Sequence, residues 1–124
     1  MKLTKLPDGE FEVMKVVWGG PVPITSRFIL NRLNGVKEWK MQTIDSYLRR
    51  LLDRGFLRSE KSGKEREYYV TINREEYLRF ETKDFIKQYH NSSLMNLVNM
   101  LFESEALSDT DLDALARWIN ERKE

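Results

Sequence analysis

The sequence predicts a mainly α-helical protein with one small β-hairpin, and three observations lead to this fold class. Apolar residues recur every three or four positions in six separate segments. Two short runs of β-prone residues lie between the third and fourth of these segments, on either side of a polar turn that contains a glycine. The hydrophobic fraction of 40% is enough for a packed core, whereas no apolar run approaches the ~20 residues of a membrane helix.

The first helix is predicted to begin at Asp8, because this carboxylate can accept hydrogen bonds from the free N–H groups of an opening turn. Phe11, Met14 and Trp18 then fall on one face of the helix. Residues 19–21, Gly-Gly-Pro, are expected to end it.

The second helix is predicted to begin at Thr25 or Ser26, which both favour N-cap positions, and to end at residues 34–35, Asn-Gly. The third, over residues 40–54, has a single apolar stripe and Gly55 as its expected C-cap. The stripe consists of Ile44, Leu48, Leu51 and Leu52. The opposite face is polar and carries Gln42, Thr43, Ser46, Arg49, Arg50 and Asp53.

The hairpin is predicted from residues 56–60 and 66–72, with residues 61–65 as its polar turn. In the second run Tyr68, Val70 and Ile72 alternate with polar or half-polar neighbours, so one face of the strand can pack on a core.

Three further helices are predicted after Asn73, over residues 74–90, residues 93–102 and a stretch that begins at Ser108. Asn91, Ser92 and Ser93 interrupt the first two. Asp111 follows Ser108 by three residues, which is close to the capping-box pattern for the start of a helix.

Charge is distributed unevenly along the 124 residues. Residues 1–72 contain 14 Lys and Arg against 9 Asp and Glu, whereas residues 73–124 contain 7 against 11. This asymmetry indicates that only the first part meets a polyanion. The first nine residues lack the apolar stretch of a signal peptide, and the chain has no cysteine, so we expect a cytoplasmic protein without disulfides or thiolate metal sites.

Three helices followed by a hairpin form the winged helix-turn-helix arrangement, in which the third helix enters the major groove of DNA and the hairpin lies beside the backbone. We therefore predict a DNA-binding domain over residues 1–72 and a helical dimerisation region over residues 73–124. The predicted DNA-binding residues are Lys40, Gln42, Thr43, Ser46, Tyr47, Arg49, Arg50, Lys61, Lys64 and Arg66. Asp45 and Asp53 oppose phosphate binding, although Asp45 could accept a hydrogen bond from cytosine or pair with Arg49.

Catalytic chemistry finds little support in the chain. The only histidine, His90, stands near a helix end without a cysteine partner, and phosphate-binding glycine loops, zinc motifs and nucleophile elbows are absent from the sequence. We expect neither an enzyme nor a cofactor or metal. Two other functions remain open at this point, a winged helix that docks on proteins and one that binds RNA.

Several segments resemble the penicillinase-repressor family, the BlaI/MecI/CopY type, and lie closer to its BlaI/MecI branch. These are the opening helix over residues 8–18, Trp39 with the block over residues 43–55, and residues 91–98. The resemblance implies a homodimeric repressor of a palindromic operator, with target genes for β-lactam resistance or copper handling. In the β-lactam branch it also implies release when a membrane metalloprotease sensor leads to cleavage of the repressor in its dimerisation region.

The sequence departs from the family pattern in three places. The copper branch uses a Cys-x-Cys arrangement, and this chain has no cysteine. The family's Asn-Phe cleavage pair falls on Met100 and Leu101, with Asn99 one position early. On the third helix Met41, Gln42 and Asp45 stand where the family has Pro, Lys and Gln, so its operator sequence does not transfer to this chain.

The dimerisation region is predicted from a helix that is apolar over too wide an arc for one neighbouring helix to cover. The predicted interface consists of Phe85, Leu94, Leu97, Val98, Leu101, Phe102, Leu112, Leu115 and Ile119. Packing within one chain is the alternative use of these residues. A dimer would tether two half-site readers and raise their joint affinity by ~10²–10⁴-fold.

Overall fold

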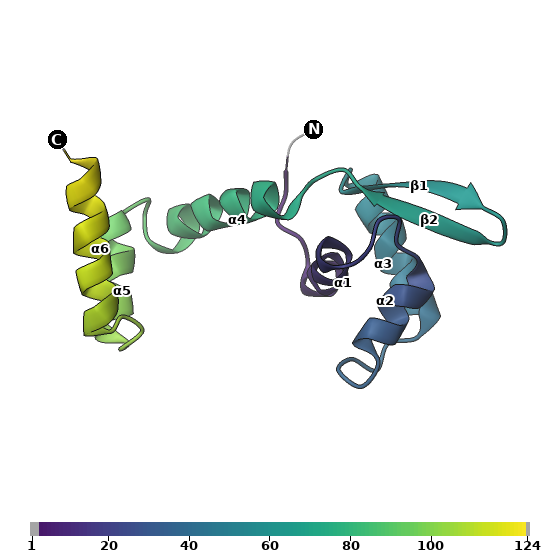
Figure 1. The fold of residues 1–124 in the computed structure, drawn as a ribbon, viewed down its shortest axis with the longest axis horizontal. Coiled ribbons are helices and arrows are strands. Elements are labelled where there is room, and N and C mark those ends of the chain that lie inside the picture. The colour runs from purple at the N-terminus through teal and green to yellow at the C-terminus, as the bar shows by residue number, and fades with distance from the viewer. Residues whose placement is uncertain (1–2, 124) are drawn as a thin grey trace. The chain divides into compact units, whose positions relative to one another are not determined.

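The computed structural model describes residues 3–123, which form six helices and one two-stranded sheet (Figure 1). The order is α1 (Asp8–Gly19), α2 (Ser26–Leu33), α3 (Met41–Asp53), β1 (Leu57–Ser62), β2 (Glu65–Val70), α4 (Arg74–Tyr89), α5 (Leu94–Glu103) and α6 (Asp109–Arg122). The chain divides into two compact units, the first of which ends at Phe80 and the second of which begins at Glu81. None of the helices in residues 3–123 is long and apolar enough to span a membrane.

The first unit is built around one hydrophobic core to which α1, α2, α3 and the hairpin all contribute. Its fully buried members include Val13 of α1, Ile29 of α2, and Ile44 and Leu48 of α3. Tyr77, in the first turns of α4, is also fully buried and receives a hydrogen bond from the backbone N–H of Leu6 over 2.8 Å. The predicted division of the chain between residues 72 and 73 stays a prediction, and Tyr77, which lies beyond it, belongs to this core.

The start of α1 corrects the predicted role of Asp8. Pro7 is the N-cap, and its carbonyl accepts the first helical hydrogen bond from the N–H of Phe11 over 2.9 Å. Asp8 is the first helical residue and makes no capping hydrogen bond. Its carboxylate still lies in the first turn, where negative charge is favourable next to the helix dipole. The prediction for α2 is confirmed, because the Thr25 hydroxyl caps it by accepting from the N–H of Phe28.

The end of α3 follows the predicted glycine signal with a shift of one residue. Arg54 is the C-cap, and Gly55 follows it with a φ of 82°. The N–H groups of Gly55 and Phe56 return to the carbonyls of Leu52 and Leu51, which is the Schellman arrangement. This turn buries Phe56 and directs the chain into β1. Leu52, predicted as part of the buried stripe, is only half-buried.

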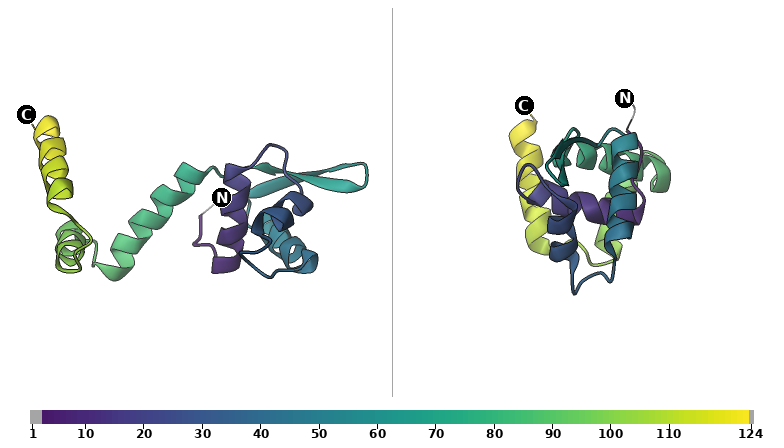
Figure 2. Two further views of the ribbon diagram at one scale, coloured as in Figure 1. Left: turned by 60° about the horizontal axis from the view of Figure 1, so that its bottom comes forward. Right: turned by 90° about the vertical axis from the view of Figure 1, so that its right-hand side faces the viewer.

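The hairpin turn is tighter than predicted, with two residues rather than five. Ser62 pairs with Glu65, and Gly63 and Lys64 form the loop between them. Gly63 has a φ of 63°, which is the positive value that two-residue hairpin turns place on glycine. The base of the hairpin is joined to the loop before α2, since Ile24 and Tyr68 exchange backbone hydrogen bonds of 3.0 and 2.8 Å. The strands extend away from the three helices as a wing (Figure 2).

The second unit lacks a closed core in the part that the structure describes. His90 is the one buried residue between positions 81 and 123, and its Nδ1 lies 2.6 Å from Oδ1 of Asn96. This contact joins the end of α4 to the first turn of α5. The predicted helix starts are confirmed at Ser93 and at Ser108, where Ser108 and Asp111 form a complete capping box.

Candidate nucleic-acid interface

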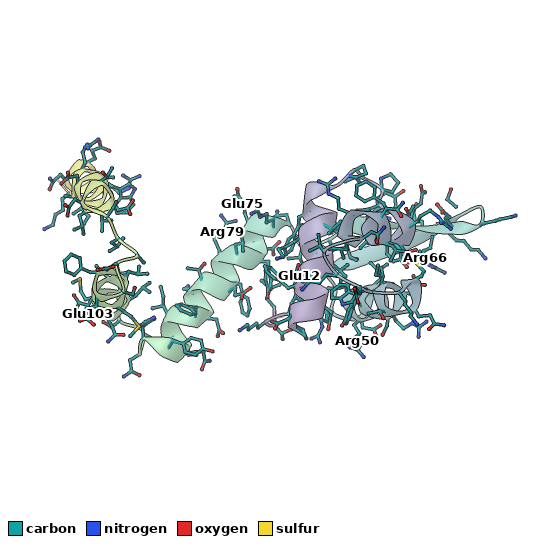
Figure 3. All side chains as sticks on the ribbon, turned by 90° about the horizontal axis from the view of Figure 1, so that it is seen from below. Glu12, Arg50, Arg66, Glu75, Arg79 and Glu103 are labelled. Carbon is teal, nitrogen blue, oxygen red and sulfur yellow. The ribbon has the colours of Figure 1, made fainter. Side chains whose placement is uncertain are left out.

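The solvent face of α3 carries four of the ten residues that the sequence predicted to bind DNA. Gln42, Ser46, Arg49 and Arg50 are exposed, opposite the buried stripe of Ile44, Leu48 and Leu51. Arg50 projects from this face (Figure 3). Lys40, the exposed N-cap of α3, and Thr43, half-buried in its first turn, lie at the same end of the helix. The polar face that periodicity predicted is thus present on the folded helix.

One flank of α3 is closed by packing against α1. The Tyr47 ring lies 5.1 Å from the Trp39 ring in an edge-to-face contact. On its other side, a Cβ placed on Gly9 would come within 2.5 Å of Cζ of Tyr47, so only glycine admits the ring in this position. The ring of Tyr47 is half-buried as a result.

The wing has two faces of different charge. In an antiparallel pair, opposed residues share a face and successive pairs alternate between faces. Lys61 and Arg66 are opposed, and they share a face with the next alternate pair, Ser59 and Tyr68. Arg66 donates a hydrogen bond to Oγ of Ser59 over 3.0 Å.

The other face of the wing carries Arg58, Glu60, Glu67 and Tyr69. The positive charge of Arg58 is already paired on this face, because its guanidinium stacks on Tyr69 and forms an ion pair with Glu60 over 2.9 Å. The basic face of the wing is therefore the face that continues from the packed base of the hairpin. Arg66 belongs to β2 and is labelled beside the hairpin in Figure 3.

A groove of about 580 Å³ lies between α3 and the wing. Its walls come from α2, from one flank of α3 and from the wing: Ser26, Arg27, Met41, Asp45, Arg49, Leu52, Lys64, Glu65, Arg66 and Tyr68. Burial raises the pKa of the Tyr68 hydroxyl, and the negative charge of Asp45 raises it further, whereas Arg66 and Arg49 lower it. Carboxylate, phenol and guanidinium groups thus act on one another across a small space.

Two groove residues on α2 were not predicted as site residues. Ser26 and Arg27 begin α2, and Arg27 lies 3.6 Å from a carboxylate oxygen of Glu65 in the wing. The helix before the reading helix crosses the DNA backbone in helix-turn-helix proteins. The position of Arg27 at the start of the second helix could therefore have predicted a phosphate contact from the sequence alone.

The pairing of Asp45 with Arg49, one of the two alternatives that the sequence left open, is not formed. Within residues 3–123 the ion pairs are Lys15–Glu12, Arg27–Glu65, Arg54–Glu10 and Arg58–Glu60, and none involves either residue. Arg49 is therefore available to an external anion, and Asp45 retains an unneutralised carboxylate on the exposed side of α3.

The predicted interface residues of the second unit lie mainly on solvent-facing surfaces. Five of them are exposed, namely Phe85, Leu94, Phe102, Leu115 and Ile119. Four are half-buried, namely Leu97, Val98, Leu101 and Leu112. Met95, Met100 and Trp118 are also exposed and were not predicted as interface residues, although each is a large apolar residue on the same two helices.

Comparison with known proteins identifies the family. The family model described as penicillinase repressor matches residues 6–121. The chain belongs to the penicillinase repressor family. This confirms the resemblance seen in the sequence and the expectation of a repressor rather than an enzyme, since the members of the family are transcriptional repressors.

Relatives of the chain include named repressors that match over nearly their whole length. The penicillinase repressor of Bacillus licheniformis is 28% identical over 98% of this chain and 94% of its own length. The methicillin resistance regulatory protein MecI of Staphylococcus aureus is 25% identical over 98% of both chains.

Two solved structures share the fold of the first unit. The DNA-binding domain of the repressor BlaI is 32% identical, with a TM-score of 0.54 over 61% of this chain and 92% of that chain. The monomeric form of Bacillus licheniformis BlaI in complex with the blaP half-operator has a TM-score of 0.51, with the same identity and coverage. These similarities confirm the predicted fold class.

Proposed function

We propose that this protein is a homodimeric transcriptional repressor that binds a palindromic operator through α3 and the wing. The observation that carries the proposal is one continuous surface in the first unit of a penicillinase repressor family member. The polar face of α3, the groove with Arg49, and the basic face of the wing all belong to it. On this surface Gln42, Ser46 and Arg50 would contact base edges, and Lys61, Lys64 and Arg66 would contact phosphates.

Dimerisation through the second unit would supply the two-fold symmetry that a palindromic operator requires. Its support is the set of exposed apolar residues on α5 and α6, which include Leu94, Phe102 and Trp118. The related BlaI was solved as a monomeric form with a half-operator, which fits one winged helix per half-site. Two tethered units would then bind the full operator more tightly than either alone.

Regulation of antibiotic-resistance genes in the cytoplasm is the part of the proposal that comes from the family. The named relatives are a penicillinase repressor and a methicillin resistance regulator. Release by cleavage in the dimerisation region would separate the two readers without change to α3. Here the cut would fall at Met100 and Leu101 of α5, where Met100 is exposed, and a membrane metalloprotease sensor would start the process.

The test is footprinting on DNA selected by the protein from a random pool. We expect a palindromic footprint with two half-sites, and duplex RNA should not compete.

Arg50→Ala should weaken operator binding by roughly 1–3 kcal/mol if Arg50 contacts a base. Unchanged affinity in the double variant Ser46→Ala, Arg50→Ala, with the fold intact, would refute the role of this face. Competition by duplex RNA at equal concentration would favour an RNA-binding function instead.

A further inference from the structure

We propose that Asp45 determines operator sequence by accepting a hydrogen bond from the exocyclic amino group N4 of a cytosine in the major groove. The inference rests on the proposed function, since it names which base edge one residue of the reading surface recognises. It assigns a binding role to a carboxylate that would otherwise only weaken the approach of α3 to DNA.

The position of Asp45 on α3 gives it access to a base edge. It is exposed, and it lies in the N-terminal half of the helix, from which reading helices contact bases. Met41, Asp45 and Arg49 follow one another at four-residue spacing along the flank that lines the groove. Asp45 therefore stands between the outward polar face of α3 and the groove beside the wing.

The carboxylate of Asp45 has no partner that would neutralise it among the residues that the structure describes. It takes part in none of the ion pairs or side-chain hydrogen bonds of residues 3–123, although Arg49 and Arg66 line the same groove. Burial is the main cause of the raised pKa of Tyr68, and the charge of Asp45 raises this pKa further, so Asp45 and Tyr68 face the same part of the groove. An ionised group in this place retains its full capacity to accept hydrogen bonds.

The chemistry of the major groove limits what such a carboxylate can bind. Guanine presents the acceptors O6 and N7, and thymine presents the acceptor O4 and a methyl group. Only the amino groups N4 of cytosine and N6 of adenine donate hydrogen bonds there, and on adenine the acceptor N7 lies beside the donor, so a carboxylate fits cytosine better. Opposite any other base edge the negative carboxylate would lie close to acceptor atoms and phosphates and would gain no hydrogen bond. The same carboxylate therefore disfavours the other bases at this position.

The experiment compares base preferences of the full-length protein and of three variants by selection from a random DNA pool, followed by competition with single-base changes. In Asp45→Ala, discrimination at one base pair of each half-site should fall by about 5- to 150-fold, which is the usual worth of one base contact. In Asp45→Asn, the preference at that base pair should move to adenine, because an amide binds N6 and N7 together. Circular dichroism should show unchanged folding, since the side chain is exposed.

Asp53→Asn is the matched control, because Asp53 is an exposed carboxylate of the same helix outside the groove lining. It should raise the affinity for random DNA without a change in base preference. The inference is overturned if Asp45→Ala binds all sequences more tightly by the same factor, since Asp45 would then only repel phosphates. If the wild-type protein itself selects no sequence, the proposed function fails before Asp45 is tested.

Discussion

Glu10 shows how one buried residue can fix the position of α3 through a partner far away in the sequence. Its side chain is fully buried in α1, and its carboxylate accepts from Nε and Nη2 of Arg54 over 2.6 and 3.4 Å. Arg54 is the C-cap of α3, so this ion pair ties α1 to the point where α3 ends and the chain turns into the wing. The sequence gives no sign of the contact, because the partners are 44 residues apart and Glu10 resembles an ordinary solvent-facing helix residue.

Replacement of Glu10 by Gln should lower the free energy of unfolding by roughly 2–3 kcal/mol. Loss of one partner of a buried ion pair leaves an uncompensated charge, and the estimate lies low in the usual range because a third of the Arg54 side chain is exposed. Urea denaturation measures the change. Glu12→Gln is the control on the same helix, since neither partner of its 2.9 Å pair with Lys15 is fully buried and the pair should contribute about 0–0.5 kcal/mol. Equal effects of the two substitutions would contradict the role of burial.

Single helices and turns were predictable where their signals are local. The caps at Thr25, Ser93 and Ser108 are side-chain hydrogen bonds to the next turn, so three or four residues of sequence contain the whole cause. The hairpin turn was predicted too wide because Lys61 and Ser62 are polar, and consecutive polar residues are typical of loops. In the folded hairpin they are strand residues, paired with Arg66 and Glu65.

The capping box of α6 should titrate in a predictable direction. Hydrogen bonds from the backbone N–H and hydroxyl of Ser108 lower the pKa of Asp111 below its ordinary value of 3.8. Because the folded pKa is the lower one, this stabilisation is present above the unfolded pKa and is lost as pH falls through the folded pKa. An NMR titration of the Asp111 carboxyl should therefore have its midpoint below 3.8. Ser108→Ala should raise the midpoint, and the same midpoint in both proteins would refute the capping contribution.

The wing should contribute to DNA binding through charge rather than through base contacts. Lys64 is exposed in the two-residue loop at the end of the hairpin, far along the strands from the packed base at Tyr68. Lys64→Ala should weaken binding to operator and random DNA alike. It should also flatten the log–log dependence of affinity on salt by up to ~1. Titrations over a range of salt concentrations, with Lys83→Ala in the second unit as control, measure both effects. A loss confined to the operator would show instead that the wing reads sequence.

At the scale of the molecule, the periodicity of α3 predicted which residues face outward but not what surrounds them. The groove depends on α2 and the wing, which are brought to α3 by tertiary packing and are not encoded near it in the sequence. The pairing of Asp45 with Arg49 was one of two uses that the sequence left open for Asp45, and it is not formed, because the four-residue spacing makes such a contact available without requiring it. The exposure of Leu94 and Phe102 on α5 was predictable because the apolar arc of this helix is wide in the sequence alone, whereas the exposed Met95, Met100 and Trp118 were not predicted.

Those residues lead to the last prediction, that Phe102→Asp produces a monomer. The Phe102 side chain is 57% exposed within one chain, so the substitution should leave the fold of that chain intact. In a dimer the same aspartate would be a buried, unpaired charge, which costs several kcal/mol unless the interface opens. Analytical ultracentrifugation should show a monomer, and affinity for a full operator should fall by ~10²-fold or more, because the second half-site loses its tethered reader. Affinity for a single half-site should stay unchanged, since the first unit has its own core.

Glu103→Gln is the control, an exposed polar neighbour on α5 (Figure 3), and it should remain dimeric. A Phe102→Asp protein that stays dimeric and binds the full operator at wild-type affinity would place the dimer interface elsewhere, and release by cleavage within α5 would then lose its physical basis.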